Sequence, residues 1–182
     1  AVVLFPVGDG VLAVGAGGVE NVLPELLHGG RTAEGIVYAT KPLSYQGQLI
    51  ENFSVRFEKG RAVEVKAEKG QDVLEQIISM DEGCHYLGEC ALVPYDSPIN
   101  QTGILFYNTL FDENACCHLA LGMGFIDTIR DYPNRSLEEM RALGVNDSMI
   151  HEDFMIGTPD LAITAHCRDG RCSFRVGVSY HT

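Results

Sequence analysis

The clearest alternation of hydrophobic and polar residues follows residue 34. Residues 35–40 form a short apolar run that predicts a strand, and residues 41–47 have the polar composition of a loop. Residues 49–57 and 62–67 alternate between apolar and polar side chains, as half-buried strands do. Because the intervening residues 58–61 have a turn composition, the two strands are predicted to form an antiparallel hairpin.

Two segments show helix signals instead. Apolar residues recur at helical spacing in residues 71–80, where they are Val73, Leu74, Ile77 and Ile78. Further along, Ser136 and Glu139 form a Ser-x-x-Glu capping box, which predicts a helix that runs through Leu143 and stops at Gly144.

The remaining apolar runs are short and predict strands, at residues 87–94, 104–107, 151–156, 160–164 and 173–178. The last two are joined by a turn at Asp169 and Gly170, across which Cys167 and Cys172 could face each other. The first thirty residues look like short strands and glycine turns. Strands that precede and follow helices, with one clear hairpin, predict an α+β or mixed α/β domain with a mixed sheet and packed helices.

Residues 109–122 combine an acidic opening with an apolar run that contains His118. Asp112 is a good N-cap, so the pattern predicts a buried helix. Glu113 and His118 are then about 140° apart around the helix and converge only if Glu113 lies on its first turn or just before it. They are either metal ligands or parts of a capped core helix whose histidine is satisfied by a neighbour.

Two other segments contain polar groups that packing does not require. Glu89 interrupts an apolar strand, where a carboxylate costs several kcal/mol unless it is paired or binds a metal. The alternative is that Glu89 faces water. His151 and Asp153 are two residues apart, so on a strand they share one face, either as metal ligands or as a surface ion pair.

Together these segments offer three carboxylates and two imidazoles without a thiolate. This donor set suits Zn²⁺, Co²⁺ or Mn²⁺, and a carboxylate can bridge two such ions. The combination therefore indicates two-metal hydrolysis.

Composition narrows the function further. The chain has 182 residues, of which 46% are hydrophobic, so it can bury a core, and its formal net charge of −12 opposes binding to nucleic acid. We expect a soluble, cytoplasmic protein, because no apolar run approaches the ~20 residues of a membrane span and the start lacks signal-peptide features. The chain begins at Ala1 without a methionine, so a processed product or a fragment is expected.

The six cysteines are expected to be reduced thiols, since the chain is long and apolar enough to fold without a disulfide scaffold. No CxxC pair is present, which argues against a structural zinc knuckle. Thiol chemistry at Cys116 or Cys117 is a weak alternative function, because burial in an apolar helix would make both thiols inert.

Several of these segments match one known family in order and spacing. The matching segments are residues 40–43, 47–50, 87–89, 93–99, 108–115, 118–122 and 144–148, followed by His151 and residues 153–157. In these segments the chain resembles the catalytic part of the thermophilic aminopeptidases of the aminopeptidase T and S type, family M29.

The resemblance implies a pair of divalent metal ions, Zn²⁺, Co²⁺ or Mn²⁺, that serve to remove N-terminal residues from peptides with free N-termini. It implies a catalytic domain at residues 35–182, a poorly matching segment at residues 1–34, and assembly as a homodimer. The metal ligands that it implies are Glu25, Glu89, Glu113, His118, His151 and Asp153, with Glu89 also counted as catalytic.

Two positions depart from the family pattern. The segment that carries a further ligand glutamate in the family is best matched by residues 21–25, which makes Glu25 the first choice and Glu20 the second. A tyrosine that follows the histidine segment in the family is Phe125 here. Family members are also longer and carry an N-terminal domain. The alternative function is therefore an impaired peptidase-like fragment or paralogue that binds metal or peptides or dimerises.

Overall fold

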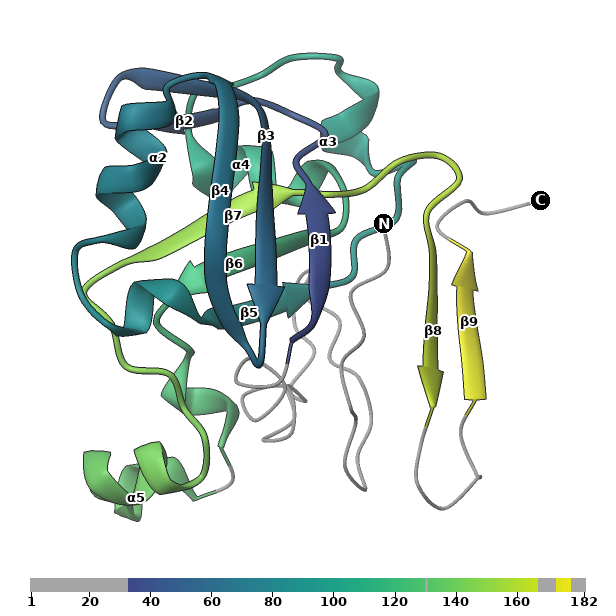
Figure 1. Ribbon diagram of the computed structural model, residues 1–182. Helices are drawn as coiled ribbons and strands as arrows, with labels where there is room; N and C mark the ends of the chain where they lie inside the picture. Colours follow the sequence, from purple (N-terminus) through teal and green to yellow (C-terminus); the bar gives the residue numbers. More distant parts are fainter. Residues whose placement is uncertain (1–32, 130, 167–172, 178–182) are drawn as a thin grey trace.

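The computed structural model describes residues 33–129, 131–166 and 173–177 (Figure 1). The described part is an α+β fold, as predicted, and its strand pairs are all antiparallel. The short strands and turns predicted for the first thirty residues, and the turn at Asp169 and Gly170 with its flanking cysteines, lie outside the described residues.

The first sheet is built around the long strand β3 (Gln48–Glu58). Strand β1 (Gly35–Tyr38) pairs with residues 54–57 of β3, and β4 (Arg61–Lys69) pairs with residues 51–58. Strand β2 (Leu43–Tyr45) pairs with residues 48–50. The predicted hairpin is present: Lys59 and Gly60 form its two-residue turn, with φ of 50° and 82°. The segment predicted as a loop contains β2.

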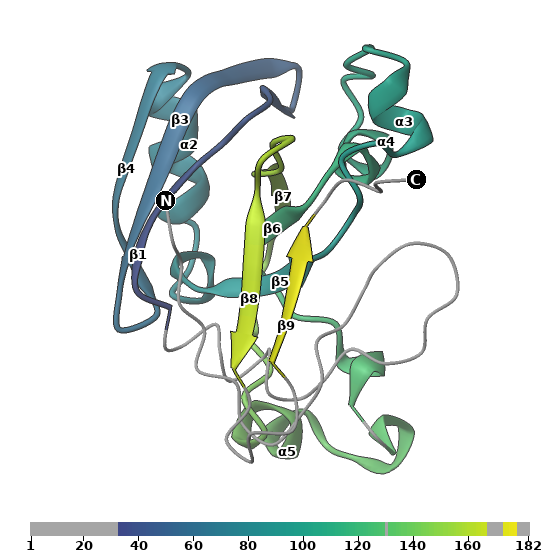
Figure 2. The same ribbon diagram turned by 90° about the vertical axis from the view of Figure 1, so that its right-hand side faces the viewer.

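The second sheet has the order β5 (Leu87–Ala91), β6 (His118–Gly122), β7 (His151–Met155). It crosses behind the first sheet in Figure 1, and Figure 2 shows the two as neighbouring layers. Strands β8 (Ala162–His166) and β9 (Ser173–Gly177) form a separate antiparallel hairpin, in agreement with the two strands predicted there.

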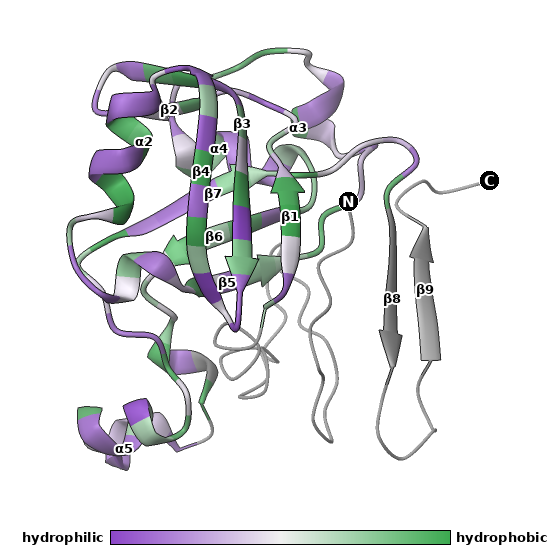
Figure 3. Ribbon diagram, viewed as in Figure 1, coloured by the Kyte–Doolittle hydropathy of each residue, from purple (hydrophilic) through white to green (hydrophobic). Residues whose placement is uncertain are grey.

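The longest helix in the described part of the chain is α2 (Gln71–Ile78), whose apolar side lies in the core and whose polar side is outside (Figure 3). The other helical segments are short: α3 (Pro98–Gln101), α4 (Thr109–Asp112), α5 (Leu137–Ala142) and the 3-10 turns η1 (Gly83–His85), η2 (Glu113–Ala115), η3 (Ile126–Thr128) and η4 (Tyr132–Asn134). The predicted capping box of Ser136 and Glu139 begins α5. Among the described residues, no helix is long and apolar enough to cross a bilayer.

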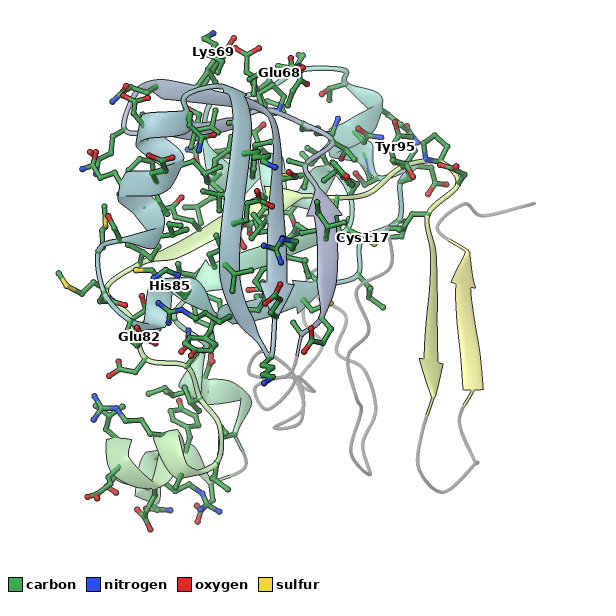
Figure 4. All side chains as sticks on the ribbon, viewed as in Figure 1. Glu68, Lys69, Glu82, His85, Tyr95 and Cys117 are labelled. Carbon is green, nitrogen blue, oxygen red and sulfur yellow. The ribbon has the colours of Figure 1, made fainter. Side chains whose placement is uncertain are left out.

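The main core lies between the two sheets and α2. Phe53 of β3 and Phe154 of β7 join the sheets, with ring centroids 5.7 Å apart. A smaller cluster beside it contains Leu92 and Cys117, with Tyr95 packed against them (Figure 4). At the far end of β4, by contrast, the charged side chains of Glu68 and Lys69 point outward (Figure 4).

The buried helix predicted from Asp112 onward is wrong. Residues 109–115 form α4 and η2, Cys116 is extended, and His118 begins the central strand β6. All five residues of β6 are buried. A strand that is buried on both faces reads as a continuous apolar run, which periodicity cannot separate from a buried helix.

Two smaller predictions are also corrected. Asp112 is not the N-cap of this segment: Asn108 caps α4, and the buried Asp112 carboxylate accepts from the backbone of Phe106 and Asn108. The strand predicted at residues 104–107 is absent from the described fold, and Tyr107 there has a φ of 57°. Its apolar side chains are largely exposed, so this run did not signal a buried strand.

Candidate metal centre

Strand register brings four predicted ligands onto one face of the second sheet. Glu89 pairs with Ala120, and Ala120 pairs with Asp153, so these three form one row across β5, β6 and β7. His118 lies two residues before Ala120, and His151 lies two residues before Asp153. Because strand side chains alternate between faces, all four polar side chains point to the same side of the sheet.

The four side chains meet through their outermost atoms. Glu89 Oε1 lies 3.4 Å from His118 Nε2, and Glu89 Oε2 lies 3.2 Å from His151 Nε2. Asp153 Oδ1 lies 3.4 Å from His151 Nε2 and 4.0 Å from His118 Nε2. Glu89, His118 and Asp153 each offer one possible ligand atom, and these three atoms lie within 4.8 Å of one another. The Glu89 carboxylate, whose side chain is 26% exposed, is thus paired with both imidazoles.

Backbone carbonyls orient both imidazoles. His118 Nδ1 is 3.2 Å from the carbonyl oxygen of Cys116, and His151 Nδ1 is 2.6 Å from that of Met123. An Nδ1–H that donates to a carbonyl leaves Nε2 facing the carboxylates, where its lone pair can bind a metal ion.

The carboxylates and imidazoles shift each other's pKa values. Burial alone would raise the pKa of Glu89, but its bonds to His118 and His151 outweigh burial and lower the pKa to about 2. Burial would lower the pKa of His151, yet Asp153 and Glu89 raise it to about 10, and Glu89 and Asp153 raise that of His118 in the same way. The site thus stabilises positive charge at the point where the two Nε2 atoms meet the carboxylates.

Glu113 lies beside these four residues. It begins η2, which packs against β7, and its carboxyl lies close enough to Asp153 for the two groups to interact electrostatically. Burial, together with the negative charge of Asp153, raises the pKa of Glu113 to about 7. The Glu113 carboxyl is therefore near the centre but not within the tight group of Glu89, His118 and Asp153.

The other predicted site residues, Phe125, Glu25 and Glu20, do not belong to this group of four. Phe125 lies in the connection after β6, and its ring is 4.5 Å from the His151 ring, centroid to centroid. Glu25 and Glu20 lie outside the described residues. Sequence reasoning missed the Met123 carbonyl and also missed Glu152, a half-buried neighbour of the ligands whose pKa is raised to about 7 by burial and by Asp153. A backbone carbonyl has no signature in a sequence, so only the fold could reveal the first of these.

The geometry fits a divalent metal ion. Asp153 Oδ1 is buried and has no well-directed hydrogen bond among the described residues, although two Nε2 atoms lie within 4.0 Å of it. A buried carboxylate oxygen of this kind is costly unless a cation binds it. The nitrogen and oxygen donors also match the preferences of Zn²⁺ and related ions.

The fold and this cluster define the class of protein: an α+β domain with a metal-binding group of carboxylates and imidazoles on one sheet face. Comparison with known sequences gives the family. A family model described as thermophilic metalloprotease (M29) matches residues 29–178. The chain belongs to this family, as the resemblance in the sequence had indicated.

Individual relatives agree with this assignment. Aminopeptidase AmpS of Bacillus subtilis (strain 168) is 55% identical over 138 residues, which cover 76% of this chain and 34% of that protein. Aminopeptidase T of Thermus aquaticus is 48% identical over 137 residues, covering 75% and 33%. A solved structure of wild-type AmpT from Thermus thermophilus superposes with a TM-score of 0.72 at 42% identity, covering 81% of this chain and 35% of that one. The matched part of this chain thus spans about a third of the length of these relatives.

Proposed function

We propose that this chain is the metal-binding part of an aminopeptidase that releases N-terminal residues from peptides with free N-termini. The observation that carries the proposal is the convergence of Glu89, His118, His151 and Asp153 on one sheet face, with both Nε2 atoms aimed at the carboxylates. The names of the aminopeptidase relatives support the reaction class.

Each residue has a defined part in this proposal. Glu89, His118, His151 and Asp153 would hold divalent metal, with Glu113 beside Asp153 and Glu25 as further ligands for a second ion. Zn²⁺, Co²⁺ or Mn²⁺ bound there would supply Lewis-acid polarisation of the scissile carbonyl and an activated water. The carboxylates of the cluster give the site the negative charge that attracts a protonated peptide N-terminus.

The chain itself fixes the ligands before any substrate binds. The Cys116 and Met123 carbonyls hold the imidazole rings, and the antiparallel register of β5, β6 and β7 holds the carboxylates. Such preorganisation lowers the cost of placing several groups around one point. The expected homodimer and cytoplasmic location are further parts of the proposal, and sedimentation velocity would measure the first.

The test is metal stoichiometry combined with turnover. The protein is stripped with chelator, refilled with Zn²⁺, Co²⁺ or Mn²⁺ and analysed for bound metal, and amino acids released from a free peptide are then measured. We expect two ions per chain and release from the N-terminus. In His118→Ala and His151→Ala, metal binding and release should both be lost.

His85→Ala is the matched control. His85 lies in η1, where its Nδ1 is 3.1 Å from the carbonyl of Ala62, away from the cluster. Its removal should leave metal binding unchanged. Metal affinity that stays the same in both cluster variants would remove the site assignment. Metal binding without release of amino acids would favour the alternative function, a peptidase-like module in which Phe125 lacks the hydroxyl of the family tyrosine.

A further inference from the structure

Asn146 is a buried polar residue with an unusual set of contacts. Its side chain is 1% exposed, and Nδ2 donates to two backbone carbonyls, that of Gly83 at 2.8 Å and that of Gly122 at 2.6 Å. Its other atom, Oδ1, is buried with no hydrogen-bond partner among the described residues. An unpaired buried acceptor destabilises the folded state. The two donated bonds must therefore matter enough to offset that cost.

Two contacts of Asn146 act on the segment that orients His151, one made by its side chain and one by its backbone. Asn146 holds the segment Gly122–Gly124 at its two ends, because Nδ2 binds the carbonyl of Gly122 and the Asn146 carbonyl accepts from Gly124 N at 2.9 Å. Between these two points lies Met123, whose carbonyl receives His151 Nδ1 at 2.6 Å. Asn146 thus reaches His151 through a single intervening peptide segment.

The segment has little room to shift. A Cβ added at Gly88 would lie 2.3 Å from the Met123 carbonyl oxygen, and one added at Gly122 would lie 2.2 Å from the Ile150 carbonyl oxygen. Met123 N also donates to that Ile150 oxygen at 2.6 Å. Backbone therefore confines the Met123 peptide on several sides, and the Asn146 amide completes this enclosure.

The chemistry of the contact requires a neutral group with two donors. A carboxylate in the same place would face the Gly83 and Gly122 oxygens with negative charge, and a hydroxyl could donate to one of them only. We propose that Asn146 is a positioning residue of the metal centre, which holds the Met123 carbonyl so that His151 Nε2 points at Glu89 and Asp153. The inference rests on the proposed function, since it deepens the account of the same site.

The test compares Asn146→Asp with Val145→Ala in the full chain. Val145 is the adjacent residue, is 3% exposed, and packs with Ile129 and Met140 in a cluster that includes no residue of 122–124. Val145→Ala therefore destabilises the same region by loss of a buried side chain but leaves the polar contacts in place. The thermal midpoints of both variants show how much of any effect is general destabilisation.

Two readouts separate positioning from stability. Imidazole ¹H–¹⁵N spectra report the His151 Nδ1–H, which should exchange slowly in the wild type and in Val145→Ala but rapidly in Asn146→Asp. Competition with a chelator gives the Zn²⁺ affinity. In Asn146→Asp this affinity should fall about 10–100-fold, the size of loss seen when a group that orients a metal ligand is removed. In Val145→Ala the affinity should stay unchanged.

A folded Asn146→Asp that keeps a protected His151 Nδ1–H and the Zn²⁺ affinity of Val145→Ala would overturn the inference. Should Asn146→Asp fail to fold, Asn146→Ser is used, which retains one donor and should show an intermediate loss of affinity and protection. Equal behaviour of Asn146→Ser and wild type would also overturn it. If wild type binds no Zn²⁺ and releases no amino acid, the proposed function fails, while the His151 proton still decides whether Asn146 positions that ring.

Discussion

The ring of Phe125 lies against the imidazole of His151, with centroids 4.5 Å apart and an angle of 46° between the planes. Phe125 is 44% exposed, so its ring lies at the edge of the metal centre and not in the core. The residue at this position therefore faces the proposed metal centre and can be changed with little effect on folding.

Phe125→Tyr should raise the rate of peptide cleavage. A hydroxyl on this ring adds a donor beside the centre, and a single donor to a developing oxyanion is worth about a hundredfold in kcat. Because the position is partly exposed, the free energy of unfolding measured in urea should stay within about 0.5 kcal/mol of wild type. Phe106→Tyr is the control, since Phe106 is also partly exposed but stacks on Phe111 with centroids 5.7 Å apart. Equal rates in Phe125→Tyr and wild type would show that another feature limits activity.

Glu113→Gln should weaken Zn²⁺ binding by about tenfold or more, if Glu113 is a ligand or hydrogen-bonds one. The matched control is Glu152→Gln. Burial and the charge of Asp153 raise the pKa of each carboxyl to about 7, but Glu152 alternates with His151 and Asp153 on β7 and so points to the opposite face. Chelator competition measures both variants. An equal loss in the two would mean that Glu113 acts through its charge alone and does not contact the metal.

The strands of the first hairpin could be predicted because their sequence signals are local. The hairpin of β3 and β4 has alternating side chains and a Lys59-Gly60 turn, and both features are local. Strand β6 has neither, because β5 and β7 cover its two edges and all of its residues are buried. The apolar run after Asp112 follows a good N-cap residue, so local signals favour a helix there. Only the strands that pair with this run make it a strand.

At the candidate site, too, some features follow from local sequence and others from long-range contacts. Residue chemistry singled out Glu89, His118, His151 and Asp153 as candidates with a structural alternative for each, and the family resemblance then named them as ligands. Their arrangement depends on the register that aligns Glu89 with Ala120 and Asp153, which is a long-range property. The roles of the Met123 carbonyl and Asn146 could not be predicted, because backbone acceptors are the same at every position.

Gly122→Ala should destabilise the protein far more than Gly47→Ala. Both glycines have a positive φ, 100° and 79°, so both alanines carry a backbone strain of roughly 1 kcal/mol. Only at Gly122 would the new Cβ meet backbone, 2.2 Å from the Ile150 carbonyl oxygen, whereas nothing lies within 4 Å at Gly47. We expect at least about 2 kcal/mol of additional loss in urea unfolding. Equal losses would mean that the end of β6 can move away from Ile150.

Asp81 links η1 to the chain that precedes β7. Its Oδ1 accepts from Cys84 N and Ser148 Oγ, both at 3.0 Å, and its Oδ2 accepts from Met149 N at 2.6 Å. Burial would raise the pKa of Asp81, but the bonds from Met149, Cys84 and Ser148 outweigh burial and lower it. The ionised carboxylate is therefore the form that stabilises the fold.

Asp81→Asn should cost about 2 kcal/mol at pH 7, because it weakens hydrogen bonds to a charged acceptor. A carboxyl whose pKa is lowered on folding contributes its full stability above the unfolded value, about 3.9, and loses it as the pH falls through the lower folded value. The difference between wild type and Asp81→Asn in urea unfolding should thus be constant from about pH 7 to pH 5 and shrink below about pH 4. Asp96→Asn, at an exposed position, should differ little from wild type in the free energy of unfolding at either end of this pH range. A gap between wild type and Asp81→Asn that persists unchanged below about pH 4 would show that the contacts of Asp81 do not depend on its charge.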